Sequence, residues 1–193
     1  MIYYDNTYKQ ILTPVCRECP DDYFSCRAKG LPDVGCCSYS PTFTLFELYK
    51  IVKDQRYDLI DRLSRNHNVT WNRYEVIVHA NIDTSFFEID LSPLSTIEQD
   101  DLKLQHSVCQ FFIEGKGCGL DPTYKTSVCR SFFCTTVEDR LSLDEGVQIG
   151  AAVKEIKADA EMFNNFHERE LKIRNVTLKD NFGEVINYLK EIH

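Results

Sequence analysis

The chain has 193 residues, of which 43% are hydrophobic, so it is long enough to bury a core without depending on cross-links. Its 30 acidic residues outnumber the 22 basic ones and give a formal net charge of -8. This balance argues against a nucleic-acid partner, because affinity for nucleic acids depends on neutralising phosphates with lysine and arginine.

The first feature along the chain is a group of cysteines in a polar segment. It contains the C-x2-C step Cys16 and Cys19, then Cys26, and then the adjacent pair Cys36 and Cys37. A C-x2-C step on a loop can turn two thiolates toward one metal centre, and both zinc and iron–sulfur sites use it. Adjacent cysteines pair with each other poorly, because a disulfide between them strains the intervening peptide.

Ordinary globular sequence follows. Hydrophobic residues recur at helical spacing from Thr44 to Leu63 and predict one amphipathic helix there. Residues 74–79 and 85–90 alternate apolar with polar, or nearly so, and predict two short strands. Residues 81–84 would close these strands into a hairpin.

The second group of cysteines consists of Cys109, Cys118, Cys129 and Cys134. Residues 111–114 and 118–120 flank a Gly-Lys-Gly turn and predict a second hairpin within it. Phenylalanines stand beside several of these cysteines and would form a dry wall around a metal centre, which slows its hydrolysis and tunes its potential.

Two helices are expected after the last cysteine. Ser142 and Glu145 form a capping box at the start of the first helix, and Thr177 with Asp180 is a weaker start signal for the last. The stripes expected to face the core are Ile149, Val153, Ile156, Ala160 and Phe163 in the first helix, and Phe182, Val185, Ile186, Leu189 and Ile192 in the last. The sequence therefore predicts an α+β fold: a single, small, mostly helical domain over residues 1–193, with short strands or hairpins and irregular cysteine-bearing loops around a metal site. The cysteine region would cover residues 16–134 and the carboxy-terminal helices residues 142–193.

The start of the sequence lacks the basic and apolar regions of a secretory signal, and no apolar run reaches the ~18 residues that span a bilayer. Both features predict a cytoplasmic protein without a membrane partner. In a reducing compartment its nine cysteines would bind metal or remain thiols. Buried free cysteines and disulfides are the alternatives, but the clustering favours metal, because scattered core cysteines would also occur on the helical stripes.

The cysteine pattern resembles a known family. The second group, with Cys109-Gln110-Phe111, Gly117-Cys118 and Cys129-Arg130-Ser131-Phe132, is similar to the second half of the YkgJ-like "CxxCxxCC" proteins, which are described as zinc- or iron-chelating. The first group, followed by a threonine-containing segment and a helix with an early glutamate, Glu47, resembles the amino-terminal half. The chain departs from the pattern in the insertion that carries Cys26 and in Lys125–Val128, where the family often has Arg-Pro.

The resemblance and the clustering together imply a metal-binding cysteine-cluster protein, with a [4Fe–4S] iron–sulfur cluster as the expected cofactor and zinc as the alternative. The predicted metal ligands are Cys16, Cys19, Cys36, Cys37, Cys109, Cys118, Cys129 and Cys134. Whether Cys26 is also a ligand stays open. The other functions considered are a structural zinc-binding interaction module and, because the family includes flagellin lysine N-methylases, a cluster-dependent protein-modifying enzyme. The protein or small-molecule partner is not indicated.

Two histidines were also considered as ligands. His106 is a possible nitrogen ligand, although a surface or capping role suits it better, and His79 is expected to be a structural residue.

Overall fold

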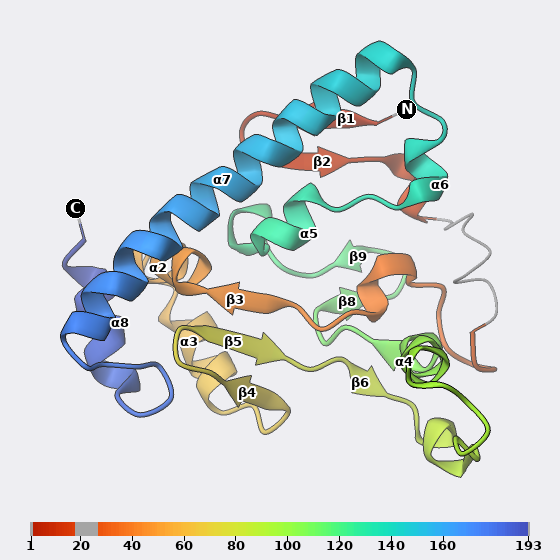
Figure 1. The fold of residues 1–193 in the computed structure, drawn as a ribbon, viewed down its shortest axis with the longest axis horizontal. Coiled ribbons are helices and arrows are strands. Elements are labelled where there is room, and N and C mark those ends of the chain that lie inside the picture. The colour runs from red at the N-terminus through yellow and green to blue at the C-terminus, as the bar shows by residue number, and fades with distance from the viewer. Residues whose placement is uncertain (1, 18–26, 193) are drawn as a thin grey trace.

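The computed structural model describes residues 2–17 and 27–192, and it has the predicted α+β fold of helices with short antiparallel strands (Figure 1). The strands are β1 (Tyr3–Asp5), β2 (Gln10–Leu12), β3 (Thr42–Thr44), β4 (Val69–Trp71), β5 (Glu75–Val78), β6 (Asn81–Ile82), β7 (Ser107–Val108), β8 (Phe112–Ile113) and β9 (Gly117–Cys118). The α-helices are α2 (Leu45–Lys53), α3 (Tyr57–Ser64), α4 (Thr96–Gln105), α5 (Ser127–Ser131), α6 (Thr135–Glu138), α7 (Leu143–Ile173) and α8 (Phe182–Lys190). Short 3-10 helices are η1 (Pro14–Arg17), η2 (Gly35–Ser38), η3 (Thr84–Glu88) and η4 (Pro122–Tyr124).

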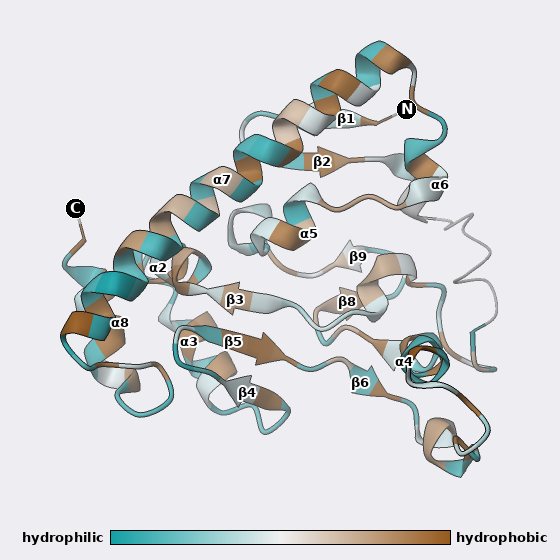
Figure 2. Ribbon diagram, viewed as in Figure 1, coloured by the Kyte–Doolittle hydropathy of each residue, from teal (hydrophilic) through white to brown (hydrophobic). Residues whose placement is uncertain are grey.

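The larger of two apolar cores, here called the large core, forms around the sheet β3-β5-β4. Helices α2, α3 and α8 and the carboxy-terminal end of α7 cover it, and α2 contributes several fully buried side chains, including Leu45 and Leu48. Cys109 and Cys118 pack against the same core. The hydropathy colouring shows this concentration of apolar residues in β5 and the helices around it (Figure 2).

A second, smaller apolar cluster, here called the small core, forms where the hairpin β1–β2 meets α6 and the amino-terminal half of α7 (Figure 1). Its buried members are Ile2, Ile11, Val137, Ile149 and Ile156. Ion pairs between Lys9 and both Glu155 and Asp159 also join the hairpin to α7. No helix in the described part of the chain is long and apolar enough to cross a membrane.

The prediction of one helix from Thr44 to Leu63 was wrong, because the chain turns between α2 and α3. Helix α2 ends in a Schellman motif: the Arg56 N–H donates to Ile51 O at 2.9 Å, and the Gln55 N–H donates to Val52 O at 3.0 Å. Gln55 adopts the left-handed conformation with φ 55° that usually requires glycine. The apolar stripe continues through this turn, so hydrophobic spacing alone does not detect it.

The predicted hairpin between residues 74–79 and 85–90 was also wrong. Strand β5 forms, but it is the central strand between β3 and β4, and β6 pairs with β7 instead. Residues 84–88 form the 3-10 helix η3, because the Asp83 side chain accepts a hydrogen bond from the Ser85 N–H at 2.9 Å and starts a turn.

The later predictions fit the structure more closely. Strands β8 and β9 form the second hairpin, and α7 begins at the capping box of Ser142 and Glu145. The last helix begins at Phe182, because Thr177 and Asp180 bond to each other in the preceding turn rather than capping the helix. Its expected inner face is correct, with Val185, Ile186 and Leu189 buried.

Candidate thiol site

Four of the predicted ligands come together from four separate parts of the chain. Cys37 lies in η2, Cys109 between β7 and β8, Cys118 in β9 and Cys129 in α5. The charge of each thiolate would act on the pKa of its neighbours: Cys37, Cys118 and Cys129 all raise the pKa of Cys109. The Cys109 N–H also donates to Cys37 O at 2.6 Å, which joins the two cysteine groups through the backbone. These four cysteines are called the thiol group below.

The hairpin β8–β9 holds Cys118 near Cys109. Gly115 and Gly117 make its turn, with positive φ angles of 74° and 89° that favour glycine. At the hairpin's base the Gly119 N–H donates to Phe111 O at 2.7 Å. The hairpin lies beside α5, which carries Cys129 (Figure 1).

Two polar side chains fix the start of α5. Thr126, which is buried, is its N-cap and accepts a hydrogen bond from the Cys129 N–H at 3.1 Å. Glu47, fully buried in α2, accepts from the Ser127 N–H at 2.8 Å. The same carboxylate accepts from the Thr44 N–H at 3.0 Å as part of the capping box of α2. Glu47 therefore links the cysteine-bearing helix to the large core.

Three sulfur atoms of the thiol group accept hydrogen bonds that stabilise a thiolate. The donors are the Phe111 N–H to Cys109, the Leu120 N–H to Cys118 and the Thr126 hydroxyl to Cys129. Hydrogen bonds to sulfur are a regular feature of the surroundings of thiolate-bound metal centres.

Burial acts in the opposite direction and keeps most of these thiols protonated in the absence of a cation. It raises the pKa of Cys109 to about 11, and it also raises the pKa values of Cys118 and Cys129. Cys129 is the most exposed residue of the four, yet its thiol is sufficiently buried that the loss of solvation raises its pKa. Cys37 differs, because its hydrogen bond with Cys36 lowers its pKa to about 7, with a further contribution from Lys125.

Of the other predicted ligands, Cys36 adjoins the thiol group through its hydrogen bond with Cys37, and the rest lie elsewhere in the fold or outside the described residues. Cys134, the N-cap of α6, packs against the small core. Cys16 lies in η1, next to Val15, which packs against the same core, while Cys19 and Cys26 fall outside the described residues. Cys36 stands beside Cys37 and raises the pKa of Tyr39.

Within residues 2–17 and 27–192, no three histidine, cysteine or acidic side chains are arranged so that they could hold a single metal ion. The two histidines considered above have structural hydrogen bonds. Nδ1 of the buried His106 lies 2.8 Å from Leu102 O, which makes it a capping residue but not a surface one, and Nε2 of His79 lies 2.7 Å from Thr70 Oγ1.

Sequence reasoning missed the residues that support the thiols. Lys125 lowers the pKa values of Cys37, Cys118 and Cys129 by its positive charge, and Thr126 caps α5. A threonine three residues before Cys129, preceded by a lysine, was the available signal for both. The link from Glu47 to Ser127 has no local signal, because the two residues are far apart in the sequence.

Comparison with models of protein families, with curated proteins and with solved structures finds no match for this chain.

Proposed function

We propose that the chain is a metal-binding protein in which the thiol group holds a [4Fe–4S] cluster. The observation that carries the proposal is the convergence of four cysteines from separate segments, with hydrogen-bond donors directed at three of the sulfurs. Four thiolates are the protein ligands that such a cluster requires. The resemblance of the cysteine spacing to a zinc- or iron-chelating family supports the same conclusion.

The electrostatics of the site favour a cationic occupant. Several buried thiolates close together repel one another, and among the described residues Lys125 is the cation that lowers the pKa of three of them. A metal centre supplies the missing positive charge and replaces the protons of the raised-pKa thiols. Thiolate ligands select soft metals, which makes iron–sulfur clusters and zinc the candidates.

The arrangement of the thiols is our reason for proposing the cluster ahead of zinc. A single zinc ion draws four sulfurs to about 2.3 Å from one point, and the described residues contain no such arrangement. A four-iron cluster places its own iron and sulfide atoms between the thiolates, so that it suits sulfurs that lie near one another without sharing one ion. Zinc remains the alternative, and it would make the site structural.

Anaerobic purification followed by an optical spectrum and elemental analysis tests the proposal. We expect a brown protein with broad absorbance near ~400 nm from thiolate-to-iron charge transfer, and iron with acid-labile sulfide. A colourless protein with stoichiometric zinc would establish the alternative. Protein that takes up neither metal, even after reconstitution with iron and sulfide, would overturn both.

A further inference from the structure

The structure has a pocket of about 760 Å³, and its lining includes residues that are close in the sequence to cysteines of the thiol group but none of those cysteines themselves. Ser38, Tyr39 and Ser40 line the pocket directly after Cys37, and Ser107 lines it two residues before Cys109. Its volume falls in the range of ~300–1,000 Å³ that is typical of small-molecule sites.

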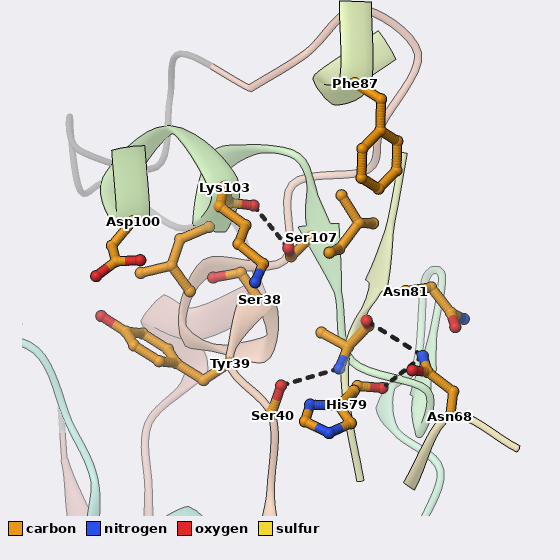
Figure 3. Close-up of a pocket in the computed structure, with 13 residues that line it drawn as sticks. Ser38, Tyr39, Ser40, Asn68, His79, Asn81, Phe87, Asp100, Lys103 and Ser107 are labelled. Atoms are coloured by element: carbon orange, nitrogen blue, oxygen red, sulfur yellow. Dashed lines mark hydrogen bonds between the residues drawn. The ribbon is translucent and has the colours of Figure 1, made fainter. Parts of the chain in front are cut away.

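Hydrogen bonds fix the walls of this pocket (Figure 3). The Asn68 side-chain amide donates to His79 O at 3.3 Å, and the Ala80 N–H donates to Ser40 Oγ at 2.9 Å. On the opposite wall the Ser107 hydroxyl donates to the backbone carbonyl of Lys103 at 2.6 Å. The pocket is therefore formed in advance, which lowers the entropy lost when a ligand binds.

Two side chains of opposite charge, Asp100 and Lys103, line this pocket. Asp100 and Lys103 lie three residues apart on α4 and therefore on one side of the helix. In the described part of the chain, neither side chain makes an ion pair or hydrogen bond. Figure 3 shows Lys103 extending between Asp100 on one side and Asn81 on the other.

The remaining lining gives the pocket an apolar side. Ile82, Leu104 and the phenyl ring of Phe87 contribute to it, and Phe87 is 70% exposed. An exposed phenyl ring at the rim of a pocket offers a flat surface on which an apolar or aromatic group can pack.

We propose that this pocket binds a free amino acid with an apolar or aromatic side chain. Asp100 would hold the α-ammonium group, Lys103 the α-carboxylate, and the wall with Phe87 the side chain. Among the described residues of the lining, Lys103 is the only lysine or arginine, which suits one carboxylate better than a chain of phosphates. The single carboxylate of Asp100 suits one ammonium group better than a divalent metal ion, which takes several oxygen ligands.

Calorimetric titration of the full-length protein with phenylalanine, leucine and two blocked analogues tests this inference. Phenylalanine and leucine should bind, while N-acetyl-phenylalanine and phenylalanine amide should each bind about tenfold more weakly, because each lacks one charged partner. Lys103→Met and Asp100→Asn should each weaken phenylalanine binding by about tenfold or more. The matched control is Lys157→Met on the exposed face of α7, which should bind phenylalanine like the native protein.

The blocked analogues also show which charged group of the ligand each side chain binds. Lys103→Met should not weaken the binding of phenylalanine amide further, and Asp100→Asn should not weaken that of N-acetyl-phenylalanine further. Absence of binding by any amino acid at millimolar concentration would overturn the inference, and so would equal losses in Lys157→Met. Because the described residues that line the pocket include no cysteine, binding should persist in metal-free protein, so this test does not depend on the proposed metal centre.

Discussion

Helix α5 lies between the two apolar cores, and one buried charged side chain attaches it to each. On the side of the large core, both oxygens of Glu47 accept hydrogen bonds, from the Ser127 N–H and the Thr44 N–H. On the side of the small core, Arg130 of α5 donates through Nη1 to Tyr8 O at 3.3 Å and Lys9 O at 3.2 Å in the β1–β2 hairpin. Its Nε and Nη2 are buried and have no hydrogen-bond partner in the described part of the chain.

The two attachments differ in how completely the buried charge is satisfied. A buried charge with all its hydrogen bonds made holds two elements together, whereas one with unmade bonds retains much of its desolvation penalty. Three of the four cysteines in the thiol group, Cys109, Cys118 and Cys129, are attached to the large core directly or through Glu47. Cys134 belongs to the small core. The proposed metal centre would therefore belong with the large core rather than with the small core.

The largest expected effect is on metal content. Cys118→Ser and Cys129→Ser should each lose most of the bound metal, because serine lacks the soft thiolate that the metal requires. Cys134→Ser should lose less, since this cysteine packs against the other core. Metal per chain, measured for each variant after identical anaerobic purification, gives the comparison.

Cys26→Ser is the matched control, because Cys26 lies in the segment that the family pattern lacks, and it should retain nearly all of the metal. If Cys134→Ser empties the site while Cys129→Ser leaves it full, the assignment of the metal centre to the large core is wrong.

The next effect is on the free energy of unfolding, which should differ between variants of the two residues that attach α5. Glu47→Ala leaves the Ser127 and Thr44 N–H groups without their acceptor, so the free energy of unfolding should fall by about 3–5 kcal/mol. Arg130→Met removes a buried cation whose hydrogen bonds are only partly made, although its charge attracts Glu47, so the free energy of unfolding should fall by less than for Glu47→Ala. Urea unfolding of both variants in the same metal state measures the difference. A loss for Arg130→Met as large as that for Glu47→Ala would contradict the comparison.

The sequence predicted those parts of the fold whose signals are local. The capping box of Ser142, the buried face of α8 and the glycine turn of β8–β9 are each set by residues a few positions apart. The break after α2 was missed because Gln55 takes a conformation that glycine usually signals. The partners of β5 were missed because strand pairing depends on tertiary packing, and alternation alone does not choose between neighbours.

The candidate site was predicted to a similar extent. Clustering and spacing predicted eight cysteine ligands, and the structure brings four of them, Cys37, Cys109, Cys118 and Cys129, near one another. Cys134, which was also predicted as a ligand, follows Cys129 by five residues but packs against the small core. The support from Glu47 depends on a contact between α2 and α5, which no local pattern encodes.

The smallest expected effect concerns Lys50, which lies in α2 close to the Arg130 attachment. Burial, with a further contribution from the charge of Arg130, lowers the pKa of Lys50 from 10.5 to about 8. The unfolded chain therefore binds more protons than the folded one between about pH 8 and pH 10.5, and the stability of the native protein should rise with pH in that range. The difference in pKa corresponds to roughly 3 kcal/mol, which partial exposure to solvent reduces to about 2 kcal/mol.

Lys50→Met should accordingly be more stable than the native protein near pH 7, and this difference in stability should vanish by about pH 10.5. Urea unfolding of both proteins across this range isolates Lys50 from the cysteines and tyrosines that titrate alongside it. A constant difference between the two proteins at all pH values would show that Lys50 is not held in its charged form at a cost to the fold.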